Sequence, residues 1–409
     1  MGLNIGKSLR HLRRSHLQDQ VPIDVWNNHQ KIRGVNLGGW LVLEKWITPS
    51  VFRQFEGTPN ADKVKDEWSF CEVLGQVEAR RQLEQHWGSW VTEDTVRTLR
   101  GYGLNLLRIP LGHWAVDPVS SEPYVTGALD HVWRVVEWAR KYQMKVMLDV
   151  HTAPGSQNGF DNSGREGQIG WTSDPRNVER SLRVVEKLSH LIRQSPHAGT
   201  VVAIQPVNEP AHWALDVDRL INFYNDSYKA VRQDSEEVSV VFSDAFFDMK
   251  DWPDRANKSW RNVAIDSHLY HCFVEADLVK SPNQVLNKIR DQRRQIAEVS
   301  AKVPILVGEW SLETTKCYGN YFRSNFMQES DWDKPNAKRY DSNCGAEGNL
   351  NQFTPTYRQF LRDLGYTQVE SYEAGIGWIF WNFKTEASPT WNYMLAVEQG
   401  WIPKFPVEN

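Results

Sequence analysis

Eight short apolar runs, each followed by a longer stretch of mixed polarity, constrain the fold of this chain more than any other feature. The runs are rich in β-branched residues and occupy residues 33–39, 105–111, 145–151, 201–210, 238–246, 263–270, 303–311 and 376–383. Each is mostly apolar on both faces until its last residues, which is typical of a parallel strand covered on both sides. Between the runs, residues 128–143, 178–192 and 283–300 place their apolar side chains on one helical face.

Eight such alternations in 409 residues predict an α/β fold, a single (β/α)8 TIM barrel. The rival, an open doubly wound sheet, normally begins with a G-x-G-x-x-G turn, which this sequence lacks. Residues 40–104 and 311–352 are too long for simple connections, so we expect them to form elaborated loops over the C-terminal face of the barrel. We divide the chain into an N-terminal extension, residues 1–30, and one barrel domain, residues 31–409.

The composition argues against two classes of partner. Lys and Arg number 47 against 51 Asp and Glu, and the resulting net charge of −4 provides no basic field for nucleic acid. No apolar run approaches the roughly 18 residues that a membrane helix needs. The 19 Trp, 13 Tyr and 16 Phe supply rings that fill cores and also stack on sugars. We expect a monomer with neither a nucleic-acid nor a membrane partner.

The first residues and the cysteines bear on localisation and on metals. The segment MGLNIGKSLRHLRRSH lacks the apolar core of a signal peptide, which predicts a cytoplasmic protein, or a secreted one if a leader has been removed. Cys317 and Cys344 flank one loop-like stretch and could form a disulfide, whereas Cys71 and Cys272 are expected to be buried thiols. The sequence has no Cys-x-x-Cys pair and no HExxH, so we predict neither a metal nor a cofactor.

Polar side chains gather at the ends of the predicted strands. They are Arg108, His151, Asn208, Glu209, Asp244, His268, Tyr270, Glu309 and Trp381. Taken singly, an arginine there is usually a surface cation, a histidine a satisfied hydrogen-bonding group, and a glutamate an ion-pair partner. Because such groups are costly to bury without partners, and because all of them reach one rim of a barrel, together they predict an active site.

Glu209 and Glu309 end the fourth and seventh runs, which lie opposite one another across a barrel mouth. Two carboxylates so placed suit cleavage of a glycosidic bond, one as the acid and the other as a nucleophile or as a base acting on water. A separation of about 5–5.5 Å would mean retention of configuration, and a wider one inversion. We expect Glu209 to be the acid, its proton held by a neighbouring negative charge, and Pro210 to end the strand.

The remaining strand-end residues can support this pair. Arg108 could keep Glu309 ionised through a charge-assisted hydrogen bond, and Tyr270 could donate to the same carboxylate. Asn208 could hold a sugar hydroxyl through its amide. The two histidines, His151 and His268, could bind hydroxyls or orient Glu209, and Trp381 could form a floor beneath the reacting sugar.

Several long motifs, spread over residues 31–403, resemble glycoside hydrolase family 5, and the likeness is greatest to its fungal exo-β-1,3-glucanases. The motifs are RGVNLGGWLVLEKWITPSVF, LNLLRIPLG, LDVHTAPGSQNGFDNSG, QPVNEP, DSHLY, VGEWS and GWIFWNFKTE. The resemblance implies a retaining double displacement, with Glu209 as acid/base and Glu309 as nucleophile. It also implies that Glu44 binds the terminal glucose and that Phe160 and Phe273 clamp the next sugar. Asn162, in the same segment as Phe160, joins the predicted substrate-binding residues.

Three functions remain open on this reading. The first is an exo-acting hydrolase that releases glucose from the non-reducing end of β-1,3-glucan. The second is a diglycosidase that releases a disaccharide such as rutinose from a flavonoid glycoside. The third is a carbohydrate-binding protein without catalysis, which the presence of both glutamates disfavours. The sequence departs from the glucanases at Trp46 and His113, which border the predicted substrate entrance.

Overall fold

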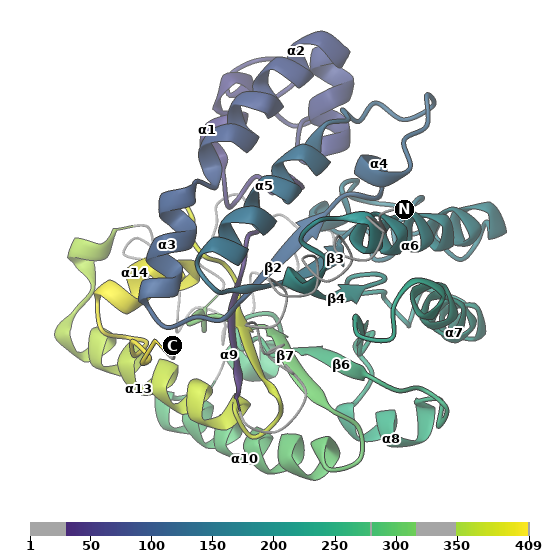
Figure 1. The fold of residues 1–409 in the computed structure, drawn as a ribbon. Helices are drawn as coiled ribbons and strands as arrows, with labels where there is room; N and C mark the ends of the chain where they lie inside the picture. Colours follow the sequence, from purple (N-terminus) through teal and green to yellow (C-terminus); the bar gives the residue numbers. More distant parts are fainter. Residues whose placement is uncertain (1–29, 279, 316–348, 408–409) are drawn as a thin grey trace, which may run out of the picture.

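The computed structural model describes residues 30–278, 280–315 and 349–407. Its centre is a closed barrel of eight parallel strands in sequence order, surrounded by helices (Figure 1). The strands are β1 (Ile32–Asn36), β2 (Leu106–Leu111), β3 (Lys145–Val150), β4 (Val201–Gln205), β5 (Ser239–Ser243), β6 (Val263–His268), β7 (Ile305–Glu309) and β8 (Gly377–Phe380). β1 pairs with both β2 and β8, which closes the cylinder. The predicted (β/α)8 barrel is confirmed.

All eight predicted runs contain a strand, but most runs extend past the point where the strand ends. The clearest case is the run 201–210, whose strand ends at Gln205. Pro206 follows immediately and has no N–H to continue the ladder. The expectation that Pro210 ends this strand was therefore wrong, and Glu209 lies on irregular backbone beyond it.

Helices cover the outside of the barrel (Figure 1). The helices longer than six residues are α2 (Glu67–Trp90), α3 (Glu93–Gly101), α5 (Ala128–Lys141), α6 (Pro175–Gln194), α7 (Val217–Asp234), α10 (Pro282–Ser300) and α13 (Pro355–Tyr372). The shorter ones are α1 (Pro49–Phe52), α4 (His113–Val116), α8 (Trp252–Arg255), α9 (Glu275–Leu278) and α14 (Tyr393–Glu398). The three helices expected from periodicity appear as α5, α6 and α10. α6 begins earlier than the expected range, because the Asp174 side chain caps the helix and Pro175 is its first residue.

Residues 40–104 are not simply an elaborated loop. They contain α1, α2 and also α3, the helix that lies between β1 and β2 in the barrel order. α3 is short, but the Thr92 side chain accepts from the Thr95 N–H at its start, and Val96 and Leu99 are buried on one face. This two-residue apolar stripe was too short to stand out from the sequence.

Several sequence expectations fall mostly or wholly outside the described residues. These are the N-terminal extension, most of the second long loop and the cysteine pair Cys317 and Cys344. Cys71 and Cys272 are described, and both are buried, as expected.

The barrel interior has an apolar layer below a polar one. The apolar layer is a separate cluster with one buried residue from each of seven strands: Ile32, Leu106, Met147, Ala203, Val241, Leu306 and Ile379. Side chains two positions apart on a strand point to the same side. Arg108, Asp149 and Gln205 each lie two positions beyond a member of this layer, so they form the next layer toward the C-terminal face. All three are fully buried.

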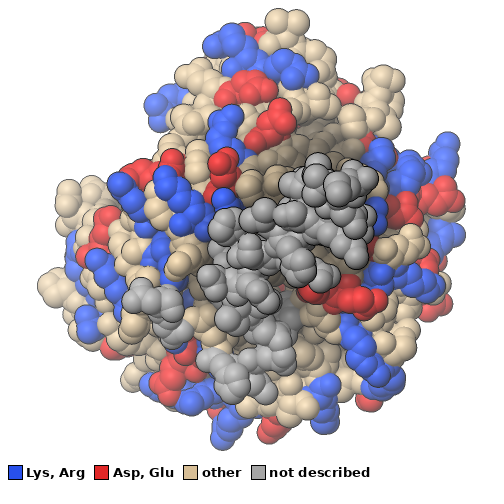
Figure 2. All heavy atoms as spheres, viewed as in Figure 1, with Lys and Arg blue, Asp and Glu red and all other residues tan. Residues whose placement is uncertain are grey.

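On the face shown in Figure 2, acidic and basic side chains are interspersed rather than gathered into a field of one sign. None of the described helices combines the length and the apolar character that a membrane span requires.

Gly308 lies next to Glu309 on β7, and a substitution there tests how tightly this polar layer is packed. A Cβ at Gly308 would overlap Oδ1 of the buried Asp266 carboxylate. We expect Gly308→Ala to lower the free energy of unfolding by about 3 kcal/mol in denaturant titrations. Gly199→Ala is the matched control, because a Cβ there meets nothing within 4 Å, and it should change that free energy by less than about 0.5 kcal/mol. Equal effects of the two substitutions would contradict the packing described here.

Candidate active site

A fully buried guanidinium lies at the centre of the polar layer. Arg108 Nη1 donates to Asn36 Oδ1 at 2.7 Å and to Glu309 Oε1 at 2.9 Å. Its Nη2 donates to Asn208 Oδ1 at 2.7 Å, and Nε and Nη2 both donate to Gln205 Oε1, at 3.0 and 2.8 Å. The rigid fork of the guanidinium therefore fixes four side chains that come from different parts of the barrel rim.

Carboxylates around Arg108 compensate its charge. Asp149 Oδ2 lies 3.1 Å from Nη2, and Asp266 Oδ2 lies 3.9 Å away. Burial alone would lower the pKa of Arg108, but the charges of Asp149, Glu309 and Asp266 outweigh it and hold that pKa above its ordinary value. The guanidinium is a permanent cation in the interior.

Glu309, the last residue of β7, has both carboxylate oxygens bound. Oε1 accepts from Arg108, and Oε2 accepts from the Tyr270 hydroxyl at 2.8 Å. These are the two contacts expected from the sequence. Burial and the negative charge of Glu209 raise the pKa of Glu309, whereas the charge of His268 lowers it. Together they leave the pKa of Glu309 above its ordinary value.

Glu209 lies four residues beyond β4 in a left-handed backbone conformation, with φ of 45°. Such a conformation is uncommon for a residue with a side chain and persists only where the surroundings enforce it. Gln157 helps to hold this conformation. Its Nε2 donates to the Asn208 carbonyl, and its backbone carbonyl accepts from the Ala211 N–H. The carboxylate accepts from Asn162 Nδ2 at 3.1 Å through Oε2.

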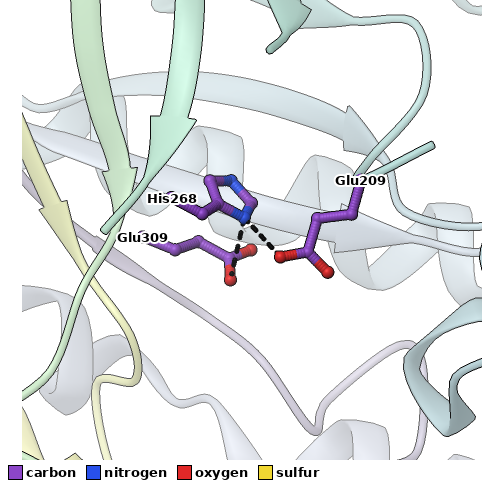
Figure 3. A group of neighbouring side chains, drawn as sticks. All are labelled: Glu209, His268 and Glu309. Atoms are coloured by element: carbon purple, nitrogen blue, oxygen red, sulfur yellow. Dashed lines mark hydrogen bonds and ion pairs between the residues drawn. The ribbon is translucent and has the colours of Figure 1, made fainter. Parts of the chain in front are cut away.

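His268, at the end of β6, lies between the two glutamates (Figure 3). Its Nδ1 is 2.6 Å from Glu209 Oε1 and 3.3 Å from Glu309 Oε2, and its Nε2 is 3.2 Å from Asp266 Oδ2. Burial lowers the pKa of His268, but Glu309, Asp266 and Glu209 outweigh burial and raise it well above its ordinary value. These surroundings favour the protonated form of the ring.

The charge on His268 corrects the expectation for Glu209. A neighbouring negative charge was expected to hold a proton on Glu209. Burial does raise the pKa of Glu209, but the charge and hydrogen bond of His268 outweigh burial and leave that pKa below its ordinary value. The surroundings thus favour a proton on His268, whose Nδ1 lies 2.6 Å from the carboxylate, over a proton on Glu209.

His151 and Trp381 form a second arm of the site. The two rings stack with centroids 5.4 Å apart and an angle of 8° between their planes. His151 Nδ1 lies 2.5 Å from Asp149 Oδ2, which orients the ring. Both side chains are almost fully buried.

Glu44 lies in the loop after β1 and is buried. Its Oε2 accepts from Trp46 Nε1 at 3.1 Å. Burial and the negative charges of Asp161 and Glu309 raise the pKa of Glu44 well above its ordinary value. Asp161 is half-buried, and its removal from solvent together with the charge of Glu166 raises its pKa to about 7.

The two predicted clamp residues differ in their surroundings. Phe160 immediately precedes the short 3-10 helix η2 (Asp161–Ser163) and is half-buried. Phe273 is half-buried as well, and its ring packs edge-on against Tyr270 at 5.2 Å. Tyr270 and Phe273 both contact Trp391, which in turn packs against Trp46.

Five buried polar atoms in the site have no hydrogen-bond partner among the described residues. They are Glu44 Oε1, His151 Nε2 and Asn208 Nδ2, together with Asp149 Oδ1 and Asp266 Oδ1. Buried polar groups are nearly always satisfied, so unsatisfied ones in a cluster need an explanation. Hydroxyl groups of a bound ligand would supply partners for the first three.

The structure gathers the predicted pair and its expected supporting side chains, and it adds partners that the sequence analysis missed. The missed residues are Asn36, Asp149, Asp161, Gln205, Asp266 and Trp391. Two of them carried a usable signal. Asp149 and Asp266 stand two positions before His151 and His268 on their strands, and a period of two places such pairs on one side.

Glu209, His268 and Glu309 also offer donor atoms that lie within 4.8 Å of one another, close enough to hold a metal. Each of the four carboxylate oxygens, however, already has a side-chain partner. Because the Arg108 cation lies 2.9 Å from Glu309 as well, the site does not favour a further cation.

Comparison with known proteins identifies the family. Residues 72–344, more than half of the chain, match the family described as Cellulase (glycosyl hydrolase family 5). The chain belongs to glycoside hydrolase family 5. It is therefore a glycoside hydrolase, as its resemblance implied.

Relatives that align with almost the full length of the chain are named glucan 1,3-beta-glucosidases. A "Glucan 1,3-beta-glucosidase" of Blumeria graminis is 38% identical over 382 residues, which is 92% of this chain and 88% of that protein. "Glucan 1,3-beta-glucosidase 1" of Schizosaccharomyces pombe is 37% identical, with the same coverage. Among solved structures, the rutinosidase from Aspergillus niger superposes with a TM-score of 0.73 at 20% identity, covering 93% of this chain and 99% of that one. At that identity the likeness concerns the fold alone.

Replacement of Arg108 tests its central place in the family 5 site. Lysine keeps the charge but has three donors on one atom, so Arg108→Lys cannot hold Asn36, Glu309 and Gln205 together. We expect it to lower the free energy of unfolding by about 2 kcal/mol and hydrolysis of aryl β-glycosides by about 100-fold.

The control for this prediction is Arg81→Lys, since Arg81 forms an exposed ion pair with Glu78. Its effect on the free energy of unfolding should stay within about 0.5 kcal/mol. The prediction fails if Arg108→Lys is tolerated as well as the control in unfolding and activity assays.

Proposed function

We propose that this chain is a retaining β-glycoside hydrolase in which Glu309 is the nucleophile and Glu209 the acid/base. One observation carries the proposal: two buried carboxylates share one site, with an oxygen of each within 4.8 Å. Inverting enzymes need a gap of about 6.5–9.5 Å to admit a water molecule, whereas retaining enzymes need only about 5–5.5 Å.

In the first step, Glu309 attacks the anomeric carbon, and the bond from that carbon to the leaving oxygen breaks. Arg108 and Tyr270 fix the attacking carboxylate through its two oxygens. The His268 Nδ1 proton passes to Glu209 across their 2.6 Å contact, and Glu209 donates it to the leaving oxygen. Glu209 is then a carboxylate and His268 is neutral.

In the second step, Glu209 accepts a proton from a water molecule as its oxygen attacks the anomeric carbon. The bond from that carbon to Glu309 breaks, and the sugar leaves with its original configuration. Glu209 returns this proton to His268, and the positive charge of Arg108 stabilises Glu309 as it becomes a carboxylate again.

We further propose exo-action on β-1,3-glucan with release of glucose. The names of relatives that are 36–38% identical over nine-tenths or more of this chain support this substrate. The polar atoms without partners on Glu44, His151 and Asn208 are suited to the hydroxyls of one terminal sugar. The stacked Trp381 ring would lie beneath that sugar, and Phe160 and Phe273 would hold the next one.

A substrate panel tests the proposed specificity. Incubation with laminarin, a β-1,3-glucan, should release glucose as the first product seen by chromatography. Incubation with rutin should release neither rutinose nor glucose at a comparable rate. Release of rutinose from rutin, with no release of glucose from laminarin, would show a diglycosidase instead of a glucanase. Turnover of neither substrate would contradict both.

Two substitutions test the proposed roles. Glu309→Ala removes the covalent route and should lower kcat by about 10⁴-fold or more on every glycoside. Glu209→Ala should reduce hydrolysis of laminarin by a similar factor, but it should spare the first step on dinitrophenyl glycosides, whose leaving groups need little protonation. Pre-steady-state release of dinitrophenol measures that step. Equal losses on both substrates would contradict the role of Glu209.

A further inference from the structure

The N-terminal turn of α2 bonds to two loops that carry predicted substrate-binding residues. The loop after the first strand, called the first loop, covers residues 37–48 and contains Glu44. The loop after the third strand, called the third loop, covers residues 151–174 and contains Asp161 and Asn162. None of these three residues lies on a barrel strand, so contacts outside the strand ladders must fix their side chains.

Glu67 holds the first loop. Its side chain is fully buried, and its Oε2 accepts from the Leu43 N–H at 2.9 Å. Leu43 directly precedes Glu44. The backbones of Glu44 and Asp66 also form an isolated antiparallel bridge, so the loop and the start of α2 are joined at two successive residues, Leu43 and Glu44.

Asp66 and Trp68 hold the third loop. Asp66 Oδ1 caps α2 by accepting from the Ser69 N–H, while Oδ2 accepts from the Glu166 N–H at 2.7 Å. The Trp68 N–H donates to the Gly164 carbonyl at 3.0 Å. The Arg165 guanidinium lies 3.9 Å above the Trp68 ring. Consecutive residues of one helical turn thus bind both loops.

The two loops meet the catalytic pair from one side. Asn162 donates directly to Glu209 at 3.1 Å. Glu44 lies close enough to Asp161, Glu309 and Glu209 for their charges to act on its carboxyl group. A displacement of either loop would therefore move groups that face the terminal sugar.

From these contacts we propose that the start of α2 is a clasp, in which Asp66 and Glu67 are positioning residues that set Asn162 and Glu44 for the terminal sugar. The proposal rests on the proposed function, because it assumes that Glu44 and Asn162 serve a glycoside substrate. Burial of a carboxyl group at Glu67 is otherwise costly, since burial raises its pKa to about 8. An apolar side chain would fill the same space more favourably, but it could not accept from Leu43.

A double-mutant cycle tests the first half of the clasp. Glu67→Leu should lower kcat/KM for 4-nitrophenyl β-glucoside by tenfold or more when Glu44 is present. In a Glu44→Ala background the same change should cost less than twofold, because the residue that Glu67 positions is gone. Glu67→Gln, which keeps a carbonyl oxygen for Leu43, should restore most of the activity. Val77→Ala, at an 86% exposed position of α2, is the control and should leave kcat/KM unchanged.

The contact of Asp66 with the third loop is tested separately, so that the proposal can still be refuted if Glu67→Leu does not fold. Asp66→Asn removes one of the two acceptors that Ser69 and Glu166 use, and its loss of kcat/KM should disappear in an Asn162→Ala background. Thermal midpoints identify variants that are folded. Equal fold-losses in both backgrounds for the folded variants would overturn the clasp. Absence of glucosidase activity in the unmodified protein would instead refute the proposed function.

Discussion

The structure depends on one buried cation being balanced by the groups around it. Arg108 belongs to β2, and its partners Asn36, Gln205 and Glu309 belong to β1, β4 and β7. Buried in this way, neither the guanidinium nor the carboxylates would be stable alone, because each charge removed from water needs a partner at close range. The same contacts that satisfy the charges also fix the carboxylate proposed as the nucleophile. Stability of the barrel rim and geometry of the site therefore have a common origin.

The position of protons in the site follows from the same balance. His268 contacts Glu209, Glu309 and Asp266, so it gains more from those negative charges than it loses through burial. Glu209 in turn is left with a lowered pKa in the absence of substrate. In the proposed mechanism, acid catalysis is consequently a property of the Glu209–His268 pair, not of a single carboxyl group.

The residues proposed to bind the sugar are placed differently from Arg108, His268 and Glu309. Arg108, His268 and Glu309 lie on strands, whose ladders hold them in place, whereas Glu44 and Asn162 lie on loops. Loop residues need support from elsewhere if they are to bind with precision. Stacked aromatic rings supply part of that support, and the proposed clasp at the start of α2 supplies another part. Such loops vary more easily than strands, which is consistent with a fold shared at 20% identity.

The sequence by itself determined the barrel, because eight apolar runs buried on both faces leave few other folds. Its motifs also predicted the two glutamates that the structure brings together. Tertiary structure decided what surrounds them. Pro206 ends β4 early and leaves Glu209 on strained backbone, which no run of apolar residues reveals. The partners of His268 come from three separate strand ends, and the proton on its ring is set by their charges acting through space. Periodicity reports which residues are buried, whereas pKa values and loop positions depend on neighbours that are distant in sequence.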